Sequence, residues 1–128
     1  MIARTHLFHG YNSLRFVYQN GSAVRSPQLV LKYALNPRRS TYRAAVVVSR
    51  KVQKSAVVRN RLRRRIFEAI RADESAIGQP FDLVFTVFNE QLNDLSPAKL
   101  HDLVYSQLQK AGVLDANTPG HDIVSGRN

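Results

Sequence analysis

The chain contains no cysteine, which excludes disulfide bonds and thiolate metal sites and suits a reducing compartment. No apolar run approaches the length that spans a bilayer. The first residues, MIARTHLFHGYNS, lack the apolar segment of a secretory signal peptide. We therefore expect a soluble cytoplasmic protein that has no membrane partner.

The most informative absence is that of negative charge from the first half of the chain. The first 67 residues hold fifteen lysines and arginines and no aspartate or glutamate, whereas all nine acidic residues follow them. The net charge of the whole chain is +10. A segregated basic half indicates that the protein binds a polyanion, most simply a nucleic acid. An anionic lipid surface and an unused, solvated basic face are the alternatives.

The hydrophobic pattern divides the 128 residues into elements of one small α+β domain. Apolar segments predict strands at 28–35, 42–49 and 81–88, and amphipathic periodicity predicts helices at 13–20, 56–70 and 97–111. We expect these elements to form a two-layer sandwich in the order α-β-β(-β)-α-β-α. A single nucleic-acid-binding domain would span 1–128, with an ordered core over about 10–113 and a mobile tail over 114–128.

Residues with special backbone preferences mark where the helices begin and end. Ser96 is a suitable N-cap for the last helix, and Pro97 suits its first position. Gly21 suits the left-handed position that follows the first helix, and Gly112 ends the last one. These signals set the expected boundaries of both helices.

The stretch AVVRNRLRRRIFEAI at 56–70 carries five arginines on one helix, although like charges three and four residues apart repel each other. Its core face consists of Val58, Leu62, Ile66, Ala69 and Ile70. Upstream, SRKVQK adds Arg50, Lys51 and Lys54 close to the helix start, where free N–H groups and the helix dipole also favour anions. Arginine forms forked hydrogen bonds with phosphate, so a bound polyanion would relieve the repulsion.

Read with SRK before it, the segment RNRLRRRIFEAI resembles the bacterial ribonuclease P protein component, whose pattern is Arg-Asn-Arg, an apolar residue and two basic residues. The resemblance covers most of the chain, because SLRFVYQNG, QLVLKYAL, AVVVSRK and FDLVFTV follow in the family's order. It implies a left-handed β-α-β crossover, which is an exception to the usual hand. It also implies an accessory subunit without catalytic residues or a metal site, bound one-to-one to a catalytic RNA. That RNA uses Mg²⁺ to hydrolyse the 5′ leader from precursor tRNA and leaves the mature 5′ end.

Two groups of site residues follow from this resemblance and from the basic cluster. The residues expected to contact the catalytic RNA are Arg50, Lys51, Lys54, Arg59, Asn60, Arg61, Arg63, Arg64 and Phe67. The leader is expected between the first helix and the sheet, at Leu14, Tyr18 and Lys32. Leu14 and Lys32 stand where the family commonly has aromatic residues, so charge contacts should matter more here than stacking. Phe67 replaces a usually basic residue, and it either packs beside the core or stacks on an unpaired base.

Other functions fit the sequence less well. A structural ribosomal-type protein could show the same basic α+β pattern without any role in tRNA maturation. DNA binding is not expected, because no pair of short helices forms a helix-turn-helix. Catalysis by the chain itself is not expected either, because His6, His9, His101 and His121 show no partner pattern and no acid precedes Glu68. We expect His6 and His9 in a flexible lead-in, His101 in solvent, and Glu68 paired with a neighbouring arginine.

Overall fold

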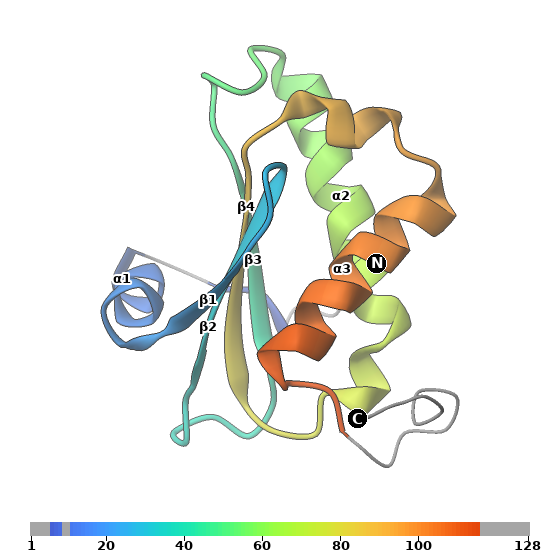
Figure 1. Ribbon diagram of the computed structural model, residues 1–128. Helices are drawn as coiled ribbons and strands as arrows, with labels where there is room; N and C mark the ends of the chain where they lie inside the picture. Colours follow the sequence, from blue (N-terminus) through green and yellow to red (C-terminus); the bar gives the residue numbers. More distant parts are fainter. Residues whose placement is uncertain (1–5, 9–10, 116–128) are drawn as a thin grey trace.

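The computed structural model describes residues 6–8 and 11–115 (Figure 1). Its α-helices are α1 (Tyr11–Asn20), α2 (Ala56–Ala72) and α3 (Pro97–Ala111). Two short 3-10 helices are η2 (Glu74–Ala76) and η3 (Glu90–Asp94). Its strands are β1 (Ser22–Arg25), β2 (Leu29–Leu35), β3 (Arg43–Val48) and β4 (Phe81–Val87). The predicted α+β class and element order are confirmed, and β1 is the optional additional strand. The tail that was predicted to be mobile begins at residue 114, and its residues 116–128 lie outside the described residues.

The four strands form one sheet in the order β1-β2-β4-β3. β2 is antiparallel to both β1 and β4, whereas β3 and β4 are parallel and are connected through α2. Helices α2 and α3 cover one face of the sheet, and α1 lies on the other face (Figure 1). The left hand of the β3-α2-β4 crossover stays a prediction. In the part of the chain that the structure describes, no helix is long and apolar enough to cross a membrane.

The hydrophobic core lies between the sheet and helices α2 and α3. Alternate residues of the strands point into it, among them Leu31, Val46 and Phe85. The predicted core face of α2 is confirmed: Leu62, Ile66, Ala69 and Ile70 are buried, and Val58 is half-buried. The arginines therefore occupy the remaining circumference of α2, where Arg61 and Arg64 are exposed.

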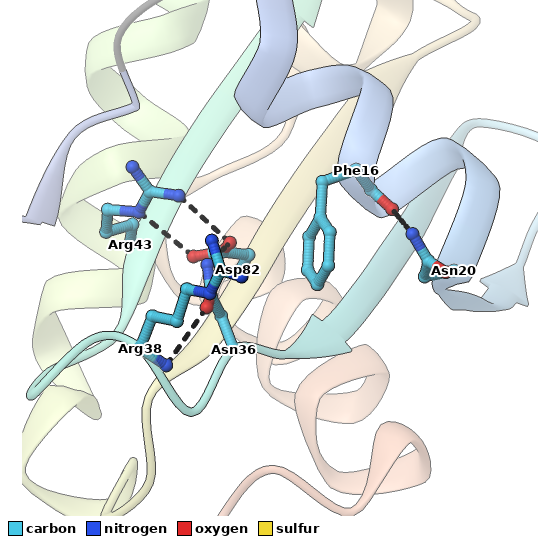
Figure 2. Close-up of polar contacts among 6 residues, drawn as sticks. All are labelled: Phe16, Asn20, Asn36, Arg38, Arg43 and Asp82. Carbon is cyan, nitrogen blue, oxygen red and sulfur yellow. Dashed lines mark hydrogen bonds and ion pairs between the residues drawn. The ribbon is translucent and has the colours of Figure 1, made fainter.

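The opposite face of the sheet carries α1 and a buried ion pair. Val17 of α1 is 1% exposed and is the buried anchor of that helix. On the same face of the sheet, the Arg43 guanidinium donates to both carboxylate oxygens of Asp82, each at 3.0 Å (Figure 2). Asn36 Nδ2 donates to the same carboxylate at 2.9 Å, and the guanidinium lies 4.7 Å from the centre of the Phe8 ring. Both buried charges are thus compensated.

Gly112 ends α3 as predicted, with a positive φ of 77°. The expectation of a left-handed conformation at Gly21 was wrong, because Gly112 alone among the described residues has a positive φ. Glycine is needed at position 21 for another reason. A Cβ atom there would lie 2.5 Å from the carbonyl oxygen of Tyr33 and 2.6 Å from that of Val17. Gly21 thus lets the end of α1 approach β2 closely.

The lead-in before α1 is docked where it is described, contrary to the expectation of flexibility at His6. The His6 ring stacks on the Tyr42 ring at 4.0 Å between centroids, with an interplanar angle of 9°. The Tyr42 hydroxyl donates to Glu74 Oε1 at 2.7 Å. Burial, and then the Glu74 carboxylate, raise the pKa of Tyr42, so the phenol remains a proton donor. His9 lies outside the described residues.

Candidate nucleic-acid interface

The loop between β3 and α2 is held in place by side-chain hydrogen bonds. Ser55 caps α2 by accepting a hydrogen bond from the Val58 backbone N–H at 3.3 Å. Gln53 Oε1 accepts a hydrogen bond from the Ser55 N–H, and Gln53 Nε2 donates to Glu90 Oε1, both at 3.0 Å. The loop is thus anchored both to the start of α2 and to the turn that follows β4.

A basic cavity of about 530 Å³ opens at this loop. Its lining residues are Arg50, Lys51, Lys54, Ala56 and Arg59. Arg59 Nη1 donates to the carbonyl oxygens of Gln53 and Lys54, at 3.0 and 2.9 Å, so this arginine supports the loop while it lines the cavity. Four cations beside the start of a helix make this cavity attractive to anions. The RNA contacts assigned to these residues stay predictions.

Sulfate is expected to raise the melting temperature of the free protein more than chloride does at matched ionic strength. An anion that binds only the folded state stabilises it by about 2.7 kcal/mol at a concentration of 100 Kd. Sulfate also strengthens apolar burial in general, so the comparison needs a variant. The excess over chloride should shrink in Lys51→Ala/Lys54→Ala and persist in Lys110→Ala, whose lysine lies in the last turn of α3. Equal melting temperatures in the two salts would contradict an anion site.

The side of α2 that faces away from the core carries a group of polar and basic residues, which we call the basic face. Its members are Asn60, Arg61, Arg63 and Arg64. Asn60, Arg61 and Arg64 are exposed, whereas Arg63 is half-buried and donates a hydrogen bond to Asn60 Oδ1. The basic face thus contains the exposed guanidinium groups of Arg61 and Arg64 and that of Arg63, which its hydrogen bond orients along the helix. Such an array can contact several successive phosphates.

Arg65 has a different role from its neighbours. Its Nη1 atom donates to the carbonyl oxygen of Asn93 at 2.7 Å, and its Nη2 atom donates to that of Leu95. These bonds tie the middle of α2 to the segment that leads into α3. Arg65, which the sequence did not assign to the RNA-contacting group, therefore stabilises the packing of the two helices.

Phe67 lies half-buried and packs against the hydrophobic core. This position agrees with the packing alternative, although part of the ring remains exposed. One residue further, Glu68 Oε1 lies 3.6 Å from Arg71 Nη1, which confirms the predicted pairing with a neighbouring arginine. Both side chains are about half exposed, so this ion pair contributes little to stability.

The second predicted group comes together between α1 and the sheet. Lys32 Nζ lies 4.8 Å from the centre of the Tyr18 ring, which is a cation–π contact. Tyr18 is 47% exposed, and Leu14, one helical turn before it, is half-buried on the same side of α1. The predicted orientation of Lys32, opposite to Leu31 and Tyr33, is confirmed because those two side chains pack on the core. A cation and an accessible aromatic ring thus form one small site.

His101 differs from its expected solvated position. Its Nε2 atom lies 2.7 Å from Asp73 Oδ2, at the end of α2. This contact links α3 to the residue that follows α2. The described residues contain no group of three or more histidine, cysteine, aspartate or glutamate side chains that could hold a metal ion.

Sequence reasoning missed one exposed aromatic residue, Phe88, which follows β4 directly and is 56% exposed. The apolar run at 81–88 had predicted a buried strand that includes Phe88. The alternation of side chains along a strand could have indicated this exposure. Val87 points into the core, so the next side chain, that of Phe88, points to the opposite face of the sheet.

Comparison with proteins of known family gives consistent matches. The family model described as Ribonuclease P matches residues 3–112. The ribonuclease P protein component of Chloroflexus aurantiacus is 39% identical over 104 residues, which cover 81% of this chain and 76% of that protein. The same component of Roseiflexus castenholzii is 35% identical over 109 residues, which cover 83% and 88% of the two chains.

Solved structures resemble this fold as well. The RNase P protein of Staphylococcus aureus superimposes with a TM-score of 0.76 at 22% identity, covering 86% of this chain and 98% of that one. The RNase P protein of Thermotoga maritima gives a TM-score of 0.68 at 21% identity, covering 76% and 89%. At these identities the structural likeness concerns the fold alone.

Proposed function

Because the chain belongs to the family of the bacterial ribonuclease P protein component, we propose that it binds a catalytic RNA and the 5′ leader of precursor tRNA. In a one-to-one complex it supports Mg²⁺-dependent, endonucleolytic removal of the leader, which leaves the mature tRNA 5′ end. The complex acts in the cytoplasm, where bacterial tRNA is made. The observation that carries this proposal is the presence of two separate surfaces, a cationic one at α2 and a cation beside an exposed aromatic ring at α1.

The two surfaces suit different parts of the RNA. The basic face and the basic cavity present guanidinium and ammonium groups, which bind phosphates whatever the base sequence. Tyr18 and Lys32 instead combine a π-face with a cation, which suits an unpaired nucleotide. We assign the first surface to the folded catalytic RNA and the second to the single-stranded leader.

Among the residues that the structure describes, no three acidic or histidine side chains gather in a group that could hold Mg²⁺. Mg²⁺ favours carboxylate and water oxygens. Among the described acids, Asp82 is neutralised by Arg43 and Asp73 is engaged by His101. We therefore assign Mg²⁺ to the RNA and its substrate, and the protein contributes binding and orientation only.

The experiment that tests the proposal is cleavage of precursor tRNA by the cognate catalytic RNA at low Mg²⁺. The protein should permit cleavage where the RNA alone is inactive, because its cations replace counterions that the two RNAs otherwise need. An inactive mixture, together with tight binding to ribosomal RNA, would favour the ribosomal-type alternative.

Tyr18→Ala is expected to weaken binding of precursor tRNA by the assembled enzyme and to leave mature tRNA binding unchanged, because only the precursor carries a leader. The loss should correspond to about 1–3 kcal/mol, the range for base–aromatic stacking. Tyr18→Phe keeps the ring and serves as the matched control. Equal losses for both tRNAs would place Tyr18 on the tRNA body instead of the leader.

A further inference from the structure

The sheet face that carries α1 continues beyond that helix as a strip of accessible side chains, which we call the open strip. Its members are Arg25, Lys32, Ala45, Val47, Thr86 and Phe88, all half-buried or exposed. The register places Lys32 beside Val84, and Arg25 beside Val30, which itself pairs with Thr86. The strip therefore crosses all four strands on one side of the sheet.

Phe88 ends this strip. Its backbone N–H donates to the carbonyl oxygen of Gln28 at 2.9 Å, which extends the pairing of β4 with β2 by one residue. Because Val87 points into the core, Phe88 points to the same face as Thr86. The geometry of the strand thus sets the face to which the Phe88 side chain points, and Phe88 remains 56% exposed.

Tyr18 and Phe88 are the two exposed aromatic side chains among those whose exposure the structure describes. Tyr18 lies on Lys32, whose partner across the ladder is Val84. Phe88 follows Val84 by four residues, which corresponds to about 13 Å along a strand. The two rings therefore stand at two separate points of the same face, a few nucleotides apart on an extended strand of RNA.

The charged side chains of the open strip indicate which kind of partner it can bind. Its charged members are the cations Arg25 and Lys32, and the exposed Arg50 follows two residues after the end of β3, the strand that pairs with β4. The one acid of β4, Asp82, is buried and paired with Arg43. Spaced aromatic rings within a basic, open surface suit single-stranded nucleic acid, because unpaired bases can stack while the backbone follows the cations. A duplex would keep its bases away from both rings.

We propose that Phe88 is a second stacking platform for the 5′ leader, which holds an unpaired base a few nucleotides away from the base at Tyr18. This inference rests on the proposed leader binding. It also explains how a chain with Leu14 and Lys32 beside Tyr18 retains aromatic contacts with the leader: the second ring is supplied by the end of β4.

The test uses the protein assembled with its cognate catalytic RNA and a series of precursor tRNAs whose leaders are lengthened one nucleotide at a time. With the native chain, affinity should rise at the length that reaches Tyr18 and rise again at the length that reaches Phe88. Phe88→Ala should remove the second rise alone, a loss of about 5- to 150-fold for 1–3 kcal/mol of stacking. Phe88→Leu, which is apolar without a ring, should behave like Phe88→Ala, whereas Phe88→Tyr should behave like the native chain.

Each possible result either supports the role proposed for Phe88 or overturns it. Because the ring is exposed, the melting temperature of free Phe88→Ala should equal that of the native protein, so a lost rise is not caused by unfolding. If Tyr18→Ala removes the first rise and Phe88→Ala leaves the second, Phe88 is not a leader platform, although leader binding stands. If the affinity of the native chain does not rise with leader length at all, the proposed leader binding itself fails. If both rises persist in both variants, the leader is bound by other residues and the inference is overturned. A loss for Phe88→Ala that is equal for mature tRNA would place Phe88 against the catalytic RNA or the tRNA body and would overturn the inference.

Discussion

Raising the salt concentration from about 50 to about 200 mM is expected to weaken binding of the protein to its catalytic RNA by on the order of 10³, as for a protein with about six phosphate contacts. The expectation rests on the basic face of α2 and the basic cavity, which together present at least that number of cations. Each lysine or arginine that neutralises a phosphate releases counterions, so the logarithm of the affinity falls linearly with the logarithm of the salt concentration. Filter binding over a salt series measures this slope.

Arg64→Ala should flatten that slope by roughly one unit, because Arg64 is exposed on the basic face. Arg61→Ala should have the same effect for the same reason. Lys110→Ala is the matched control, since Lys110 is also an exposed cation but lies at the end of α3. Its slope should equal that of the native protein. A slope near zero for the native chain, or equal flattening by all three variants, would refute binding through the face of α2.

Asp82→Ala is expected to lower the free energy of unfolding by about 3–5 kcal/mol, because it leaves the Arg43 guanidinium buried without its counter-charge. The side chains of Arg43 and Asp82 are only 7% and 0% exposed, so water cannot replace the lost carboxylate (Figure 2). Asn36, which donates to the same carboxylate, also loses its partner. Urea unfolding of the free protein measures the change.

Two controls separate this effect from general damage. Asp102→Ala removes an acid whose side chain is 83% exposed, and it should change stability by no more than about 0.5 kcal/mol. The double variant Arg43→Met/Asp82→Leu removes both charges, and it should lose much less than Asp82→Ala because no charge is left uncompensated. If the double variant were as unstable as the single one, shape rather than charge would explain the role of Asp82.

The sequence by itself determined the secondary structure and the basic face. Periodicity, the Ser96 cap and Gly112 are local signals, and they act within a few residues of the positions that they specify. The core face of α2 followed from the same periodicity, and the arginines had to occupy the rest of its surface. The pattern around Arg59 to Arg64, read with the preceding SRK and the order of the other segments, also indicated the family that the comparisons show, because it depends on residue type and spacing alone.

Only the tertiary structure decided which distant residues meet. Arg43 and Asp82 are 39 residues apart in the sequence, and they pair because β3 lies beside β4 in the sheet. The docking of His6 on Tyr42 and the use of Arg65 to hold the segment before α3 likewise depend on strand order and helix packing. Local patterns carry no information about these neighbours, since a segment has the same periodicity whichever element it later contacts. The open strip exists for this reason: α1 covers one part of a sheet face, and the fold leaves the rest accessible.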